Sequence, residues 1–304
     1  MIQFFSGSIS RSIYKIIYKI FFPKASKHNR RYWPLYLVER DQSNRIEKIY
    51  YKKQLVSNNL QPQPISNKKC MLVATGPSIQ QLDTQLLQLP NIDYIGMNGA
   101  ISLDSVKFSS YVIIDHNFID CRFDLVEKVL KTNCTFFTTP RCLDMILRKV
   151  TYDEIHCQIK TIETITDGIV ETFLGQAKSF DQNEADFFIY NQFGFSTDIY
   201  KGSFDYFTVA YVALQIAYTL NYNEIYLAGL DMNNLSQPRF YENTDCQQPT
   251  TLNHHLDDVF QAFDTAAQLF KEKEIRVLNL SQTSAVQAFE KITLDTISDL
   301  QSNG

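Results

Sequence analysis

Residues 70–78 read Cys70-Met71-Leu72-Val73-Ala74-Thr75-Gly76-Pro77-Ser78, an apolar run of strand length that is followed at once by a tight turn. Short apolar runs of this kind alternate with segments of helical periodicity along the rest of the chain. Such alternation predicts an α/β fold with a mainly parallel sheet and helices on both faces. The expected strands are 71–74, 92–97, 111–114, 134–137, 224–228 and 276–280, and the expected helices begin near residue 118 and cover 207–220 and 255–272.

The sequence before the first of these strands has a different character. Residues 33–38 and 45–51 predict two short strands, and the proline-containing stretch that follows them predicts a linker. We therefore expect a basic N-terminal arm over residues 1–67 and an α/β domain over residues 68–304. Within that domain, residues 150–200 are less regular, which indicates inserted strands or a lid.

Charge is distributed unevenly along the chain. The 304 residues carry a formal net charge of −4, but residues 1–53 hold twelve Lys and Arg against three acidic residues, a net charge of +9. The helix predicted over residues 8–22 has an apolar stripe of Ile9, Ile13, Ile16, Ile17 and Ile20 and a basic stripe of Arg11, Lys15 and Lys19. This pattern is typical of peripheral helices, so we expect the arm to bind an anionic membrane surface. The alternative is a helix that docks on its own protein or on a dimer partner.

Several protein classes lack support in this sequence. There is no run of about 18 apolar residues and no cleavable leader pattern, so we expect a cytoplasmic protein, peripheral on the inner membrane. The six cysteines show neither CxxC nor zinc-type spacing. The motifs of P-loop NTPases, dinucleotide-binding enzymes, zincins and serine hydrolases are absent, and no Asp-x-Asp metal motif follows a predicted strand.

Polar residues follow each of the first three strands expected in the sheet. Gly76-Pro77-Ser78 comes after the first, Asn98-Gly99 after the second and Asp115-His116 after the third. The glycine lets the backbone approach a ligand, and Ser78 is expected to cap the next helix and to offer its amide to a phosphate. Because the carboxyl ends of parallel strands meet at one edge of a sheet, these residues predict a shared small-molecule cleft.

These motifs, in this order, resemble those of bacterial CMP-sugar glycosyltransferases. The runs 71–78, 98–99 and 208–231 are similar to the CMP-sialyltransferases of the Campylobacter type. A closer resemblance is to the lipopolysaccharide-core Kdo-III transferase of the WaaZ type, where Kdo is 3-deoxy-manno-octulosonic acid. The motifs that carry it are Asp198-Ile199 with Gly202, the helix that starts at Thr208, Gly229-Leu230-Asp231, Arg239-Phe240-Tyr241-Glu242 and Asn279-Leu280-Ser281. The resemblance covers roughly residues 70–290 and leaves the basic arm outside.

The resemblance implies a Rossmann-like, GT-A-like sialyltransferase variant that binds a CMP-sugar and needs neither a cofactor nor a metal ion. The donor-binding residues that it implies are Gly76, Pro77, Ser78, Asn98, Gly99, Asp115, Gly202, Thr208, Asp231, Arg239 and Tyr241. Within this set, Tyr241 is expected to contact the donor phosphate. The planar guanidinium of Arg239 suits the carboxylate of the sugar, unless it forms a surface ion pair instead.

The resemblance leaves the general base open. A histidine serves this role in the sialyltransferases, and His254 and His255 occupy the corresponding stretch, although alignment by the last strand places Asp257 there. Asp115 and His116 are further candidates for the group that takes the proton.

The function that the resemblance implies is inverting transfer of Kdo from CMP-Kdo to a lipopolysaccharide or lipooligosaccharide core acceptor. The partners would be the CMP-sugar donor, the lipid-linked glycan acceptor and an anionic membrane, with no nucleic acid. The alternatives are a CMP-N-acetylneuraminate-dependent sialyltransferase, a pterin pyrophosphokinase, which would need ATP and Mg²⁺, and a non-catalytic membrane-associated partner in glycan assembly.

Overall fold

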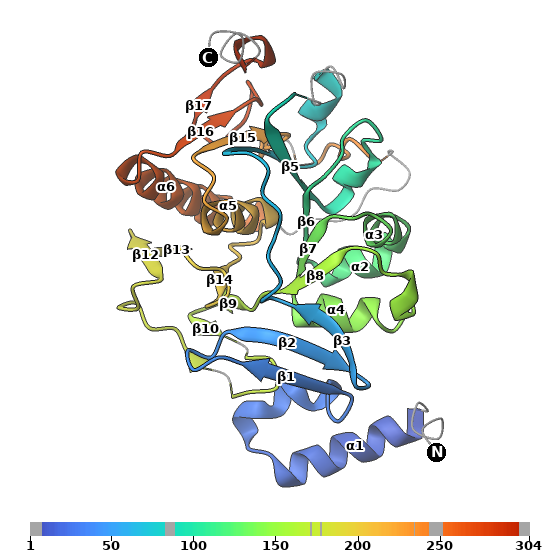
Figure 1. The fold of residues 1–304 in the computed structure, drawn as a ribbon. Coiled ribbons are helices and arrows are strands. Elements are labelled where there is room, and N and C mark those ends of the chain that lie inside the picture. Colours follow the sequence, from blue (N-terminus) through green and yellow to red (C-terminus); the bar gives the residue numbers. More distant parts are fainter. Residues whose placement is uncertain are drawn as a thin grey trace.

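The computed structural model describes residues 8–82, 89–170, 172–176, 178–233, 235–242 and 252–297. Its centre is an eight-stranded sheet in which all neighbouring strands are parallel (Figure 1). The strands are β4 (Lys69–Val73), β5 (Ile92–Met97), β6 (Ser110–Ile113), β7 (Thr135–Thr138), β8 (Gln158–Thr161), β15 (Glu224–Ala228), β16 (Arg276–Asn279) and β17 (Glu290–Lys291). Their order across the sheet is β17-β16-β15-β4-β5-β6-β7-β8, which confirms the predicted parallel sheet.

Helices cover both faces of this sheet (Figure 1). One face carries α2 (His116–Cys121), α3 (Phe123–Leu130) and α4 (Pro140–Ile146), and the other carries α5 (Val209–Thr219) and α6 (Leu256–Glu272). Alternate side chains of a strand point to opposite faces, so Met71 and Val73 pack with the first group of helices and Leu72 with the second. Parallel strands that are covered on both faces are apolar throughout, which makes their runs recognisable in the sequence. The predicted fold class is confirmed.

The N-terminal part of the chain is more structured than a simple arm. It contains α1 (Ser8–Phe21), a 3-10 helix η2 (Lys24–Arg31), and an antiparallel sheet of β1 (Tyr36–Arg40), β2 (Ile46–Tyr51) and β3 (Gln54–Asn58). The two expected strands are present. The third, β3, follows a turn in which Lys52 and Lys53 adopt φ values of 49° and 72°. Lysine is an unusual residue for such a turn, so the sequence pattern does not predict this strand.

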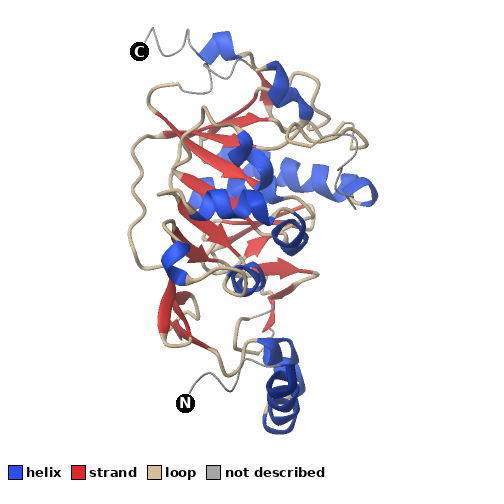
Figure 2. Cartoon of the chain, turned by 90° about the vertical axis from the view of Figure 1, so that its right-hand side faces the viewer, coloured by secondary structure: helices blue, strands red, loops and turns tan. Residues whose placement is uncertain are grey.

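Polar contacts join the three-stranded sheet to the edge strand β8 and the residues after it. The Asn59 side chain donates to the carbonyl of Thr161 at 2.8 Å. The Arg40 guanidinium forms an ion pair with Glu163 at 2.6 Å, and both side chains are largely buried. The three-stranded sheet therefore lies between the main sheet and α1, which occupies one end of the molecule (Figures 1 and 2).

The segment predicted to hold inserted strands or a lid does contain inserted strands. Besides β8, residues 150–204 form β9 (Thr164–Thr166), β10 (Ile169–Val170), β11 (Lys178–Ser179), β12 (Phe187–Tyr190), β13 (Phe193–Ser196) and β14 (Ser203–Phe204). These strands make two small sheets, β11-β10-β9-β14 and β12-β13, on the side of α5 and α6. The role of a lid stays a prediction.

The described part of the chain also contains short 3-10 helices: η3 (Pro77–Gln81), η5 (Asn98–Ser102), η6 (Tyr152–Glu154) and η7 (Leu252–His254). No helix in the described part of the chain is long and apolar enough to cross a bilayer. The five cysteines in that part are free thiols, and four of them are buried.

Candidate functional site at the switch point of the sheet

The strand order of the main sheet reverses between β4 and β15. The chain runs outward from β4 to β8 and then returns to β15 on the other side of β4. Ligands of open α/β sheets bind at such a switch point, beyond the carboxyl ends of the strands. The turn Gly76-Pro77-Ser78 follows β4 and Asp231 follows β15, so four of the predicted donor-site residues lie there.

A carboxylate joins these two strand ends. Asp231 is buried, and its carboxylate accepts hydrogen bonds from the Ser78 amide at 2.8 Å and from the Ser78 hydroxyl at 2.5 Å. The Ser78 hydroxyl also lies 2.9 Å from that of Ser281, which follows β16. The helix η3 has Gly76 as its N-cap and no side-chain cap bond, so the expectation that Ser78 caps this helix is wrong. A charged acceptor binds the Ser78 amide strongly, which leaves this amide directed at Asp231 and not at a phosphate.

Gly76 allows the close approach of the two strand ends. Its amide donates to the carbonyl of Gly229 at 2.9 Å. A Cβ atom at Gly76 would lie within 2.5 Å of that carbonyl oxygen and equally close to the Asp231 carboxylate. Any side chain would therefore separate the β4 turn from β15, so this glycine serves a contact between backbones.

Tyr241 reaches the end of β5 from a distant part of the sequence. The amide of the preceding Phe240 donates to the carbonyl of Thr75 at 3.3 Å, which holds this segment over the end of β4. A Cβ atom at Gly99 would lie no more than 2.5 Å from three atoms of the Tyr241 ring, so the ring packs directly on the glycine. The Arg122 guanidinium lies 5.3 Å from the ring centroid. Burial raises the pKa of the Tyr241 hydroxyl to about 12.

Three buried polar atoms at this edge have no hydrogen-bond partner among the described residues. They are Asn98 Oδ1, the Tyr241 hydroxyl oxygen and Asn279 Nδ2. The Arg239 guanidinium approaches the Tyr241 hydroxyl without the geometry of a well-aligned hydrogen bond. Asn98 follows β5 with a φ of 46°, and Asn279 is the last residue of β16. Leaving one buried polar group unpaired costs about 1–3 kcal/mol. Three such groups at one edge make it the candidate site for a polar ligand or ordered water.

Two carboxylates lie near the start of α5. Asp115 follows β6 as the N-cap of α2, and its side chain accepts a hydrogen bond from the Asn117 amide at 2.8 Å. Asp205 follows β14, and burial together with the nearby Asp115 carboxylate raises its pKa to about 6. The next two residues, Tyr206 and Phe207, have φ values of 41° and 63°, which are sparsely populated for residues other than glycine. The sequence pattern singles out Asp115 but not Asp205.

Gln215 of α5 holds this turn in place. Its fully buried side chain accepts hydrogen bonds from the amides of Ser196 and Phe204 at 3.0 and 2.9 Å, and it donates to the Phe204 carbonyl at 2.7 Å. Thr208 is the N-cap of α5, and its hydroxyl accepts a bond from an amide of the first turn. Asp205 is thereby fixed between a strand end and a helix start.

Of the two predicted histidines, His255 is the one that contacts this turn. Its ring stacks on Phe207 with 3.6 Å between the ring centroids and an angle of 9° between the planes. It is the N-cap residue of α6, and its Nδ1 lies 3.8 Å from an oxygen of Asp258. His254 is exposed at the end of η7. The structure therefore places His255 beside the turn that carries Asp205.

Two predicted donor-site residues have other contacts. The Arg239 guanidinium lies 2.7 Å from the Glu242 carboxylate, whose side chain is buried, so the pair differs from the surface ion pair considered as the alternative. A donor carboxylate could bind Arg239 only by replacing or sharing that partner. Gly202, with a φ of 136°, precedes β14, and a Cβ atom there would lie 3.1 Å from Ile165 in the small sheet that follows β8. The part of Gly202 in donor binding stays a prediction.

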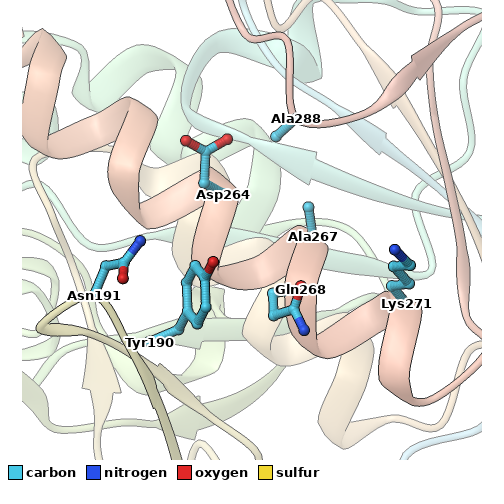
Figure 3. A pocket seen from close by; sticks show the side chains of 7 residues that line it. All are labelled: Tyr190, Asn191, Asp264, Ala267, Gln268, Lys271 and Ala288. Atoms are coloured by element: carbon cyan, nitrogen blue, oxygen red, sulfur yellow. The ribbon is translucent and has the colours of Figure 1, made fainter.

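A surface hollow of about 410 Å³ lies away from these strand ends, on α6 (Figure 3). It is lined by Tyr190, Asn191, Asp264, Ala267, Gln268, Lys271 and Ala288. None of the predicted site residues lines it, so the unpaired polar atoms at the switch point locate the candidate site better than this hollow does. Within the described ranges, no group of three or more His, Cys, Asp or Glu side chains is placed to hold a metal ion.

The part of the chain that is similar to known proteins contains many of the candidate site residues. Residues 190–296 match the family model of the 3-deoxy-D-manno-octulosonic acid transferase WaaZ. The matched segment contains Asp205, Asp231, Tyr241, His255 and Asn279. The resemblance predicted from the motifs is confirmed over this segment.

Two curated relatives carry the name probable 3-deoxy-manno-octulosonic acid transferase. The protein from Salmonella typhimurium is 32% identical over 108 residues, which cover 36% of this chain and 39% of the relative. The protein from Escherichia coli is 34% identical over 93 residues, which cover 31% of this chain and 32% of the relative. The chain thus matches about two fifths and one third of their lengths.

The solved structures to which the chain shows some similarity include the sialyltransferase CstII from Campylobacter jejuni in complex with a substrate analogue, cytidine-5'-monophosphate. It is 16% identical with a TM-score of 0.42, and the match covers 75% of this chain and 86% of that chain. The sialyltransferase CST-II in complex with a trisaccharide acceptor and CMP is 12% identical with a TM-score of 0.40, and covers 74% and 86%.

Proposed function

We propose that this chain is a CMP-sugar-dependent glycosyltransferase that transfers Kdo from CMP-Kdo to a lipopolysaccharide or lipooligosaccharide core, with inversion at the anomeric carbon. One observation carries the proposal. The segment that matches the WaaZ model contributes Tyr241 and Asn279 to the sheet edge where, with Asn98, their buried polar atoms lack partners. The names of the curated relatives supply the identity of the sugar.

The reaction replaces one bond at the anomeric carbon of the sugar. The bond to the CMP phosphate oxygen breaks, and the acceptor hydroxyl forms the new bond while a base takes its proton. Such a base is worth about 10²–10⁴-fold in rate. We assign this role to His255, because it stacks on Phe207 beside Asp205, whereas His254 is exposed. The Tyr241 hydroxyl, with a pKa of about 12, stays protonated and can donate a hydrogen bond to the phosphate.

The acceptor and the place of action follow from this proposal. A lipid-linked core sugar is presented at the cytoplasmic face of the inner membrane, so the enzyme would act there as a peripheral protein. The transfer would proceed without a metal ion, because phosphate hydrogen bonds and a base supply the groups that the reaction requires.

The first test is binding of nucleotides to the full chain. Thermal shift with CMP, CDP, UMP and ATP, each with and without EDTA, should show selective stabilisation by CMP that EDTA leaves unchanged. Tyr241→Phe removes only the hydroxyl and should weaken this stabilisation. Tyr190→Phe, in the hollow on α6, is the matched control and should not.

Transfer assays then distinguish the donors. CMP-Kdo and CMP-N-acetylneuraminate would be offered with a truncated lipopolysaccharide core, and product formation followed by mass spectrometry. Transfer of Kdo supports the proposal, and transfer of N-acetylneuraminate alone replaces it with the sialyltransferase. Stabilisation by ATP with Mg²⁺, or by no nucleotide, would refute both.

A further inference from the structure

The helix α1 is attached to the protein by its aromatic side. Tyr18 is buried and stacks on Phe22 with 4.1 Å between the ring centroids. Trp33 lies against both rings at 6.0 Å and against Tyr14 at 5.7 Å. The aromatic side of α1 therefore packs against the rest of the protein and is not available to another partner.

The isoleucine side of the same helix faces outward. Ile13, Ile16 and Ile20 are 51%, 59% and 70% exposed, and Phe21 is 74% exposed. Positions separated by three, four and seven residues share one face of a helix, so the three isoleucines form a continuous apolar strip. Phe21 lies at the end of the helix, next to Ile20 in the chain. The helix does pack on its own protein, as the alternative reading expected, but through its aromatic side, and the isoleucine stripe is left uncovered. A contiguous exposed apolar face marks an interaction surface.

The charges around this strip select the partner. Residues 8–31 contain seven Lys and Arg and no Asp or Glu. Lys15 and Lys19, four residues apart, lie exposed on the flank of the apolar strip, and Lys24 and Lys27 follow in η2, also exposed. An apolar strip with basic residues along its border fits the boundary between the acyl chains and the headgroups of an anionic bilayer.

The orientation of α1 is tied to the body of the protein through η2. The Asn29 side chain donates to the carbonyl of Gly175 at 2.6 Å, and a ring nitrogen of His28 lies 2.9 Å from the carbonyl of Thr172. These two contacts fix the direction of η2, and with it that of α1, relative to the body of the protein.

We propose that Ile13, Ile16, Ile20 and Phe21 form a docking face that inserts into an anionic bilayer. The inference deepens the proposed function and rests on it for the lipid-linked acceptor. The docking itself requires neither donor nor acceptor. It can therefore be tested apart from transfer.

The test is flotation of the full chain with vesicles that contain no acceptor. Vesicles of phosphatidylcholine alone are compared with vesicles of phosphatidylcholine and phosphatidylglycerol. We expect binding to the anionic vesicles, and a loss of about tenfold or more when Ile16→Asp places a charge in the strip. Leu60→Asp is the matched control, because Leu60 is 56% exposed outside α1, and it should bind as the wild type does. Lys15→Glu with Lys19→Glu should abolish the preference for anionic lipid.

Three results would overturn the inference. These are equal binding by the Ile16→Asp and Leu60→Asp variants, equal binding to both vesicle types, and no binding by the wild type. A wild-type dimer in sedimentation that Ile16→Asp converts to a monomer would assign the face to a second copy of the chain. Thermal shift with CMP on the same variants separates the two proposals. A variant that no longer floats but is still stabilised by CMP has lost membrane docking through α1 and kept the nucleotide site.

Discussion

Replacing Gly99 by alanine tests whether Tyr241 is seated on the end of β5. The added Cβ atom would lie no more than 2.5 Å from three ring atoms, whereas ordinary van der Waals contact begins near 3.4 Å. The ring must therefore move by about 1 Å or more. Phe118 and Phe240 surround it at centroid distances of 6.4 and 5.6 Å and restrict that movement. We expect overpacking to lower the free energy of unfolding by about 1–3 kcal/mol.

A double-mutant cycle separates this clash from other effects of the new methyl group. In a Tyr241→Ala background the methyl group has space, so Gly99→Ala should cost nothing or stabilise by up to about 1 kcal/mol through the unfolded chain. The interaction energy of the cycle should then be about 1–3 kcal/mol. Urea unfolding followed by circular dichroism measures it. CMP stabilisation should also fall in Gly99→Ala alone. An equal cost of the substitution in both backgrounds would refute the packing argument.

Three further predictions concern the carboxylates and the histidines. The pKa of Asp205 is raised from 3.8 to about 6, so the free energy of unfolding of the wild type falls as the pH rises through that range. Asp205→Asn lacks this ionisation, so in urea unfolding its stability relative to the wild type should rise by up to about 3 kcal/mol over the same range. A constant difference across that range would contradict the burial of this carboxyl. His255→Ala should reduce kcat at least about 10²-fold in the transfer assay and His254→Ala should not, and equal losses would remove the assignment. Glu163→Gln removes the carboxylate that pairs with the buried Arg40 guanidinium and should lower the free energy of unfolding by about 3–5 kcal/mol in urea. The control Glu39→Gln removes an exposed ion pair and should lower it by about 1 kcal/mol or less.

The strands next to the centre of the sheet are predictable because both of their faces are buried. The outer strand β8 is not predictable, because it contains Lys160, which is only 2% exposed. Its ammonium group donates to the carbonyls of Asn59 and Gln61 at 2.9 and 2.8 Å, and burial lowers its pKa to about 8. These acceptors come from the segment that links β3 to β4. The cost of burying the Lys160 ammonium group is offset only when the segment after β3 packs against β8 and supplies these carbonyl acceptors.

The candidate site also contains residues that the sequence pattern predicts and residues that it does not. The ends of β4, β5 and β6 are predictable as one group, because these strands are neighbours both in the sequence and in the sheet. Asp205 and Asn279 are not, since each reaches the edge through a later crossover. The local feature that marks Asp205 is the positive φ of Tyr206 and Phe207, which is visible in the structure but not in the sequence. The ion pair of Arg239 with Glu242 depends on side-chain geometry that spacing alone leaves open.

The sequence by itself determined that the chain forms a parallel α/β sheet with polar residues at its strand ends, and that its N-terminal helix is amphipathic. Periodicity is sufficient for these conclusions, because burial on one or two faces leaves a repeating pattern of apolar residues. Only the tertiary structure decided that Asp231 binds the Ser78 amide and that Tyr18 and Trp33, rather than the isoleucines, attach α1 to the protein. Both outcomes depend on contacts between segments far apart in the sequence, and periodicity does not encode such contacts.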